Sequence, residues 1–284
     1  MNNITDERLR PYRITGPALI NVSGGRTSAF MLRKILDAHN GVLPDDCRAT
    51  FQNTGLEHPA TLEFLREIEQ RWCPITWLEY ERRDDGHGFK IVNFDTASRT
   101  GEPFDQLIGA KRMLPNPVMR FCTGELKIRT GNRFAASLGW EHWTRIVGLR
   151  ADEPRRVANL KGYTSREDVE CPMAVAGHEH RDVLNFWKQQ EFDLKLPGGD
   201  NSYGNCSLCF LKSKDRTVRI MRANPELADW WVRQEQRQDI SATVSANYFR
   251  VDRPSYQNLL RLSREQKWLW DEPGDNELPC NCTD

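Results

Sequence analysis

The chain has 284 residues, enough for one large domain or for a domain with an appendage, and it carries 40 basic and 40 acidic side chains. This balance excludes recognition of a partner through overall charge, so a nucleic acid would have to be bound by a local patch. No uncharged apolar run approaches the roughly 18 residues of a membrane helix. The polar start "MNNITDERLRPYR" has no signal-peptide core. We therefore expect a cytoplasmic protein with no membrane partner.

Strand-like and helix-like segments alternate along the chain. We expect strands at 17–22, 48–53, 75–81 and 142–150, and helices that start at Ser28 and span 58–72, 126–139 and 179–190. Residues 82–121 have several Gly and Pro and are expected to be loops or short helices. The alternation predicts an α/β fold with a Rossmann-like parallel sheet, whose ligands bind at the carboxyl ends of the strands.

The region from residue 203 onward has a different character, and helices are expected to dominate it. A helix is predicted over 224–237, because Asn224 can cap it and Pro225 suits its first turn. We therefore divide the chain into a nucleotide-binding α/β domain at 1–200 and a helical region at 201–284.

The stretch "NVSGGRTSAF" (21–30) lies between the first strand and the first helix. Gly24 and Gly25 allow close approach of an anion to the backbone, and amide groups at a helix start favour negative charge. Hydroxyls of Ser23, Thr27 and Ser28 add donors. The familiar phosphate loop ends in Gly-Lys-Ser/Thr, and this stretch has no lysine. The structural alternative is a glycine turn capped by serine.

The sequence has eight cysteines, and clustered cysteines in a cytosolic chain favour metal binding or redox chemistry over disulfides. The "CSLC" at 206–209 can grip one metal ion or cluster, and Cys122 adds a third thiol. Spacing alone leaves zinc, a [4Fe–4S] cluster and a redox pair open. A fourth ligand could be Cys171, Cys280 or Cys282. Cys47 and Cys73 are expected to be ordinary thiols.

Several motifs in order resemble one family. "SGGRTS" resembles the modified phosphate loop (PP-loop) of the adenine-nucleotide α-hydrolases, or PP-loop ATP pyrophosphatases. "NTGLEHPATLEF", "VGLRADEPRR" and "CPMAVAGHEHRDVLNFW" are similar to segments of the phosphoadenosine phosphosulfate reductase-like branch, and the resemblance covers about residues 17–212. Cys122, Cys206 and Cys209 fall where adenylyl-sulfate reductases carry cluster cysteines.

The resemblance implies a set of site residues. The anionic end of the nucleotide would be held by Arg150 and Arg156, whose planar forks suit phosphate or sulfate. Nucleotide-binding positions would be Ser23, Gly24, Gly25, Arg26, Thr27, Ser28, Asn53, Thr54, Gly55, Glu57 and Gly148. The implied metal ligands are Cys122, Cys206, Cys209 and Cys282, on a [4Fe–4S] cluster with zinc as the alternative. Glu57 and Asn53 would contact ribose, water or hydrated Mg²⁺.

Three differences from the phosphoadenosine phosphosulfate reductase-like branch decide the order of the candidate functions. Phe121 precedes Cys122 where cluster-bearing reductases have adjacent cysteines, Asn53 replaces an Asp, and the tail "PCNCTD" lacks a catalytic Cys-Gly-x-His. We therefore expect first an ATP pyrophosphatase that adenylates a substrate and supports sulfur transfer. Reduction of adenylyl sulfate or phosphoadenylyl sulfate to sulfite comes second, and a non-catalytic nucleotide-binding partner third.

The expected partners are an adenine nucleotide, a nucleic-acid substrate or a sulfur-donor protein, and a second copy of the chain in a homodimer. Lys212, Arg216 and Arg219 have the spacing of one helical face, which suits a nucleic-acid backbone or simply faces solvent. The tryptophans Trp230, Trp231, Trp268 and Trp270 are expected in the core.

Overall fold

A computed structural model describes residues 7–199, 201–240 and 247–265. Its centre is a six-stranded sheet in the order β4-β3-β2-β1-β5-β6, parallel except for the antiparallel β3–β4 pair. The strands are β1 (Ala18–Asn21), β2 (Cys47–Asn53), β3 (Thr76–Arg83), β4 (Gly86–Val92), β5 (Trp143–Ile146) and β6 (Glu167–Glu170). The strand order reverses at β1, which pairs with β2 on one side and β5 on the other, and this is where α/β sheets bind ligands.

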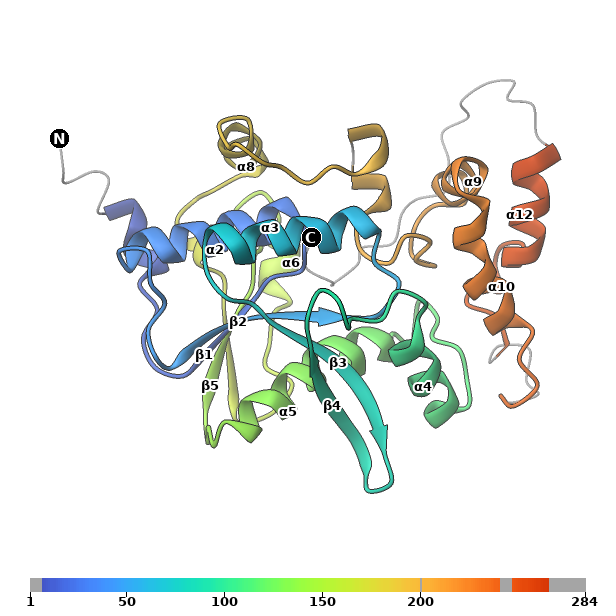
Figure 1. Ribbon diagram of the computed structural model, residues 1–284, viewed down its shortest axis with the longest axis horizontal. Coiled ribbons are helices and arrows are strands. Elements are labelled where there is room, and N and C mark those ends of the chain that lie inside the picture. The colour runs from blue at the N-terminus through green and yellow to red at the C-terminus, as the bar shows by residue number, and fades with distance from the viewer. Residues whose placement is uncertain (1–6, 200, 241–246, 266–284) are drawn as a thin grey trace.

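Helices cover both faces of the sheet (Figure 1). The α-helices before residue 200 are α2 (Arg26–Ala38), α3 (Pro59–Arg71), α4 (Glu102–Lys111), α5 (Thr130–Ser137), α6 (Pro154–Ala158), α7 (Pro172–Val175) and α8 (His180–Trp187). Short or irregular turns are η1 (Arg10–Tyr12), the π-helical η2 (Thr123–Arg129), η3 (Pro197–Gly199) and η4 (Asn201–Tyr203). None of the described helices is long and apolar enough to span a bilayer.

Alternation along β1 separates two apolar layers. Ile20 belongs to the large core that contains the buried sides of α2 and α3, whereas Leu19 packs on the opposite face with Phe134 of α5. The central strands β1 and β2 are largely buried on both faces because helices flank them. This confirms the predicted α/β class.

The expected elements occur within a few residues of their predicted bounds, but the segment 82–121 is more ordered than expected. It contains β4 and α4. Arg83 pairs with Gly86, so only two residues turn the chain between β3 and β4. The edge strand was missed because "GHGFKIV" is largely exposed and begins with glycines, which lack the side-chain packing that marks a central strand.

The C-terminal elements gather at one end of the molecule (Figure 1). They are α9 (Lys214–Ala223), η5 (Pro225–Leu227), α10 (Ala228–Glu235) and α12 (Tyr256–Glu265). Trp231 stacks on Tyr256 with ring centroids 5.0 Å apart, and Trp230 is also buried, so both confirm the core prediction. Trp268 and Trp270 lie outside the described residues.

The predicted basic stripe does not include Lys212. This lysine precedes α9, is buried, and its Nζ donates to the Gly204 carbonyl at 2.6 Å. Ser213, whose hydroxyl accepts from the Arg216 amide at 3.3 Å, begins the helix instead. Helical spacing therefore failed here because a capping serine interrupts the pattern.

Candidate nucleotide and cysteine site

The loop from β1 to α2 has the conformation of an anion-binding turn. Gly24 adopts φ +82°, and Gly25 precedes the first turn of α2. The Ser28 hydroxyl accepts from the Ser23 amide at 3.0 Å and donates to the Gly25 carbonyl at 3.1 Å, which closes the loop on itself. In the described part of the chain, no side chain caps α2. The first amides of this helix can therefore serve an anion.

Close packing explains Gly24. A Cβ at this position would lie 2.4 Å from Cγ2 of Thr61 and 3.3 Å from Cδ1 of Leu65, both on α3. The left-handed φ adds a second reason, because only glycine adopts it without strain. Gly148 is similarly confined, since its Cβ would lie 3.1 Å from the Ser28 Cα. The two loops after β1 and β5 are thus held against each other.

The Arg26 side chain turns away from the loop. It makes a bidentate ion pair with Asp193 at 2.7 and 2.8 Å, and it donates to the Leu194 carbonyl at 2.7 Å. The indole of Trp187 donates to the Arg26 carbonyl at 2.9 Å. Arg26 therefore fastens the start of α2 to the segment after α8, and only its backbone remains in the loop that was predicted to bind nucleotide.

A cavity of about 220 Å³ lies at the strand-order reversal, and we call it the cationic cavity. Its lining has four cationic side chains and no carboxylate. The lining residues are Asn21, Ser23, Phe51, Gln52, Thr123, Lys127, Ile128, Arg145, Val147, Leu149, Arg156, Asn159, Leu160, Lys161 and Tyr163. Such a lining favours an anionic ligand with one apolar face.

The predicted arginines take different places. Arg156 lines the cationic cavity and pairs with Glu153. Arg150 lies behind the loop, where its Nη1 donates to the Thr27 hydroxyl at 3.3 Å and its Nε donates to Asp152 at 2.9 Å. Glu153 lies within 3.4 Å of Arg150 as well, so one carboxylate fixes both arginines.

The three described candidate ligands line a second cavity of about 20 Å³, the cysteine cavity. Its lining is Thr54, Phe104, Cys122, Thr123, Leu126, Lys127, Asn205, Cys206, Cys209, Phe210, Leu211 and Trp231. Thr123 and Lys127 of the π-helical turn line both cavities. The structure therefore brings Cys122 together with the CxxC pair and places all three beside the cationic cavity.

The loop after β2 lies against Cys206. The Thr54 hydroxyl donates to Glu57 at 2.9 Å and lies 3.4 Å from the Cys206 sulfur. The Glu57 carboxylate also accepts from the amides of Thr54 and Leu56 at 3.1 and 3.2 Å. Burial, followed by the charge of Glu57, raises the pKa of the Cys206 thiol well above its usual range. A thiolate at this position therefore needs a bound cation or cluster to stabilise it.

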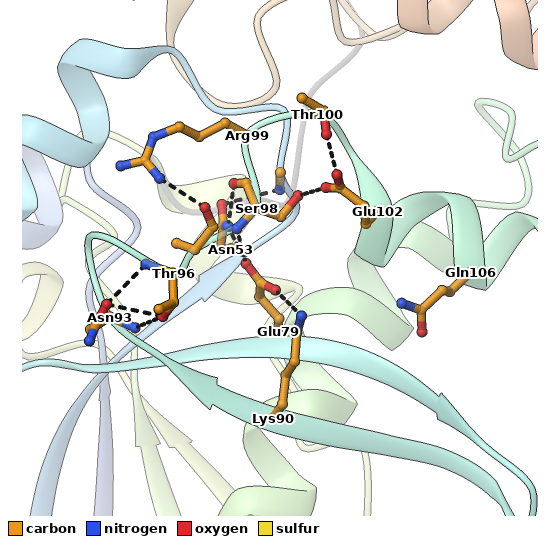
Figure 2. A network of polar contacts seen from close by, with 12 residues as sticks. Asn53, Glu79, Lys90, Asn93, Thr96, Ser98, Arg99, Thr100, Glu102 and Gln106 are labelled. Carbon is orange, nitrogen blue, oxygen red and sulfur yellow. Dashed lines mark hydrogen bonds and ion pairs between the residues drawn. The ribbon is translucent and has the colours of Figure 1, made fainter.

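Asn53 is a structural residue at the end of β2 (Figure 2). Its amide donates to the Glu79 carboxylate at 2.6 Å and to the Ser98 carbonyl at 2.8 Å, while its oxygen accepts from the Gly55 amide at 3.1 Å. Glu79 is fully buried and lies 3.0 Å from the Lys90 ammonium. The side chain of Asn53 therefore contacts this network, and its expected contact with ribose, water or hydrated Mg²⁺ stays a prediction.

The three cysteines suit a metal ion or cluster, but the space between them is small. Three thiols in one cavity have the right chemistry for iron or zinc. Among the described residues, no three His, Cys, Asp or Glu side chains are placed to hold a single metal ion. The cavity has room for little more than one water, so a four-iron cluster would require the cysteine segments to separate.

The other cysteines do not complete this set within the described residues. Cys171 packs with Val147 and Leu149, and burial raises its pKa to about 11. Cys47 and Cys73 are buried, in agreement with the expectation of ordinary thiols. Cys282, the implied fourth ligand, and its neighbour Cys280 lie outside the described residues.

Of the residues that line the cationic cavity, sequence analysis named only Ser23 and Arg156 as site residues; the missed ones with a cationic or phenolic side chain are Lys127, Arg145, Lys161 and Tyr163. Arg145 is buried and pairs with Glu167 at 2.7 Å. The missed residues come from segments without a glycine or cysteine motif. A signal existed only for Lys127, which lies in the helix predicted over 126–139, a few residues after Cys122.

Comparisons with known proteins place the chain in a family. No family model matches. The chain is 30% identical over 206 residues to the nin region protein ORF290 of Escherichia phage lambda, covering 70% of this chain and 67% of that protein. It is 24% identical over 254 residues to a 37.8 kDa protein in the gpa 5′ region of Escherichia phage 186, covering 75% of this chain and 73% of that protein.

Two solved structures are similar at lower levels. Phosphoadenylyl-sulfate reductase from Candida auris has a TM-score of 0.42 and 14% identity, and the match covers 66% of this chain and 80% of that one. The U34-tRNA thiolase NcsA from Methanococcus maripaludis, with its [4Fe-4S] cluster, has a TM-score of 0.40 and 13% identity, with coverages of 93% and 79%. On its sequence, the chain belongs to the family of the phage lambda nin region protein ORF290.

Proposed function

We propose that this protein is a PP-loop ATP pyrophosphatase that adenylates a substrate and supports sulfur transfer through its cysteines. In the adenylation step, a substrate oxygen attacks the α-phosphorus of ATP. A bond forms between that oxygen and the phosphorus, the bond to the β-phosphate oxygen breaks, and pyrophosphate leaves with the electron pair.

The observation that carries this proposal is the shared wall of the two cavities. Thr123 and Lys127 line both the cationic cavity and the cysteine cavity. A nucleotide in the first would thus lie beside the sulfur atoms in the second. Proximity of an activated carbon or phosphorus to a thiol is what a sulfur-transfer enzyme requires.

Residues of the chain supply binding and charge stabilisation for the first step. The amides at the start of α2 would hold the leaving pyrophosphate, with the Ser23 hydroxyl as a further donor. Arg156 and Lys161 lie on the wall of the cationic cavity, which Ser23 also lines, and would stabilise the negative charge that develops on the phosphates. Arg150 acts through Thr27 and orients the loop, and Mg²⁺ would accompany the nucleotide.

An iron–sulfur cluster on Cys122, Cys206 and Cys209 is the second part of the proposal. When bound, it would hold or deliver sulfur and would keep the buried thiols deprotonated. The small volume of the cysteine cavity requires the loop of Cys206 and the π-helical turn to open as the cluster assembles.

Anaerobically purified protein mixed with ATP, with and without candidate acceptors, tests the first part. Pyrophosphate release that depends on the acceptor is expected. Sulfite release from adenylyl sulfate or phosphoadenylyl sulfate, without any reaction of ATP, would instead identify a sulfonucleotide reductase. Nucleotide binding without turnover of any of the three would identify a non-catalytic partner.

A further inference from the structure

Two C-terminal helices carry more cations than acids. Helix α9 has one acidic residue, Asp215, and four basic ones: Lys214, Arg216, Arg219 and Arg222. Helix α12 has one acidic residue, Glu265, and two basic ones, Arg261 and Arg264. The whole chain has 40 basic and 40 acidic residues, so this excess is local. A neutral protein that binds a polyanion needs such a local excess.

The two helices pack against each other at one end of the molecule (Figure 1). Just before the helices, Arg253 Nη1 donates to the Lys212 carbonyl at 2.8 Å. Near their ends, Arg222 Nε donates to the Ser263 carbonyl at 3.1 Å. Arg222 therefore lies next to the residue that precedes Arg264.

The cationic side chains face outward. On α9, Val218 and Met221 are buried whereas Arg219 and Arg222 are exposed. On α12, Leu259 and Ser263 are buried whereas Arg261 and Arg264 are exposed. Each arginine pair is one helical turn apart. We call this set of Arg219, Arg222, Arg261 and Arg264 the arginine surface.

Most of the arginine surface has no internal counter-charge. Within the described ranges, Arg219, Arg261 and Arg264 make no ion pair. On α2 and α3, by contrast, Arg33 pairs with Asp37 at 2.6 Å and Arg71 pairs with Glu67 at 2.7 Å. Arg219, Arg261 and Arg264 are exposed, so their guanidinium groups can bind an external anion.

We propose that the arginine surface docks the phosphate backbone of a nucleic acid. Arginine forks match phosphate oxygens, and several of them on adjacent helices suit a polymer with regularly spaced charges. A lipid surface fits less well, because α9 and α12 bury their apolar residues in the protein and none of the exposed large apolar side chains recorded for the described residues lies on them.

The proposal also names the class of acceptor for the site described above. Ser213 and α9 follow directly after the CxxC segment, and Tyr256 of α12 donates to the Leu208 carbonyl at 2.6 Å. The helices that would bind the strand are thus attached to the segment that carries Cys206 and Cys209. Docking itself does not rest on the proposed chemistry, because it needs neither ATP nor a cluster.

The experiment measures fluorescence anisotropy of labelled single-stranded DNA, duplex DNA and single-stranded RNA with the full chain, without nucleotide, from about 50 to about 200 mM salt. The test variant carries Arg219→Glu, Arg261→Glu and Arg264→Glu. The matched control makes the same charge change at exposed arginines elsewhere: Arg8→Glu, Arg82→Glu and Arg181→Glu. Thermal melting and ATP binding verify that both variants are folded.

The test variant should bind at least about tenfold more weakly than the wild type, with a salt slope smaller by about 2 to 3, while the control changes little. The strand type that binds most tightly identifies the acceptor. An equal loss of nucleic-acid affinity in the control variant would overturn the proposal. So would wild-type protein that binds polyglutamate as tightly as nucleic acid, or that binds no nucleic acid. A failure of ATP turnover with intact strand binding would reject the proposed function alone.

Discussion

The cationic cavity and the cysteine cavity share a wall but are built differently. Residues in or just after β1, β2 and β5 supply part of the first, together with η2 and the segment after α6, so hydrogen bonds of the sheet fix that part of its geometry. Loops and helix sides from distant parts of the sequence supply the second, and C-terminal residues such as Phe210 and Trp231 close it. The first should therefore be present whenever the sheet is folded, whereas the second depends on how the C-terminal helices pack.

The largest expected effect concerns the glycine loop beside the cationic cavity, next to Ser23. Gly24→Ala should weaken ATP binding on the order of 100-fold, since strain and the contact with Thr61 would each displace the anion-binding amides. Isothermal titration with ATP measures this. Gly41→Ala is the matched control, because Gly41 has φ +88° and nothing within 4 Å of the added Cβ. The control should lose about 1 kcal/mol of stability and no affinity; an equal loss of affinity would remove the loop from the site.

The next effect concerns the cysteine cavity. Cys206→Ala, Cys209→Ala and Cys122→Ala should each lower the iron content of anaerobically prepared protein to less than about a tenth, because ligand loss releases the metal. ATP binding should persist in all three. Cys73→Ala is the control, as this buried thiol lies outside the cavity. Zinc without labile sulfide in the wild type would contradict the cluster.

A third change tests the end of β2, where Asn53 lies between Gln52 of the cationic cavity and Thr54 of the cysteine cavity. Asn53→Asp places a second carboxylate against buried Glu79 and should lower the free energy of unfolding by about 2 to 4 kcal/mol at neutral pH. Urea unfolding measures it. Adding Glu79→Gln should restore part of the loss, because the like charges are then no longer in contact. If the double variant is as unstable as the single one, charge repulsion is not the cause.

The smallest expected effect is a pH dependence of stability that should affect the cysteine cavity and not the cationic cavity. Burial raises the pKa of Glu235 to about 7, and this carboxyl accepts from the amides of Tyr256 and Phe249 at 2.7 and 3.4 Å. Because the folded pKa lies above the unfolded one, the unfolded state releases the proton first. Stability should therefore fall by up to about 3 kcal/mol as pH rises from about 4.5 to about 7.

Glu235→Gln should remove this pH dependence, as measured by urea unfolding at several pH values. Gln carries no charge and keeps an acceptor oxygen for one of the two amides, which in Glu235 donate to different oxygens. Since Tyr256 also contacts the CxxC segment, iron retention should show the same pH dependence and ATP binding should not. An unchanged pH profile in the variant would assign the effect to another group.

The residues that sequence reasoning found carry strong local requirements. The SGG turn needs glycine at a left-handed φ, and the alternating apolar segments specify the parallel sheet, so both were predictable. The side-chain directions of Arg26 and Asn53 were not. Arg26 meets Asp193, far along the chain, and Asn53 meets Glu79 from a neighbouring strand. Motif position indicates where a backbone lies, but long-range partners decide where a side chain points.

The sequence by itself determined the α/β class, the glycine turn after β1 and the set of three thiols, because each follows from periodicity, from a backbone conformation or from residue chemistry. Only the tertiary structure decided that Cys122 meets Cys206 and Cys209, that Lys127 lies between the two cavities, and that α9 and α12 align their arginines. These arrangements depend on packing between segments far apart in the chain, which local patterns do not encode.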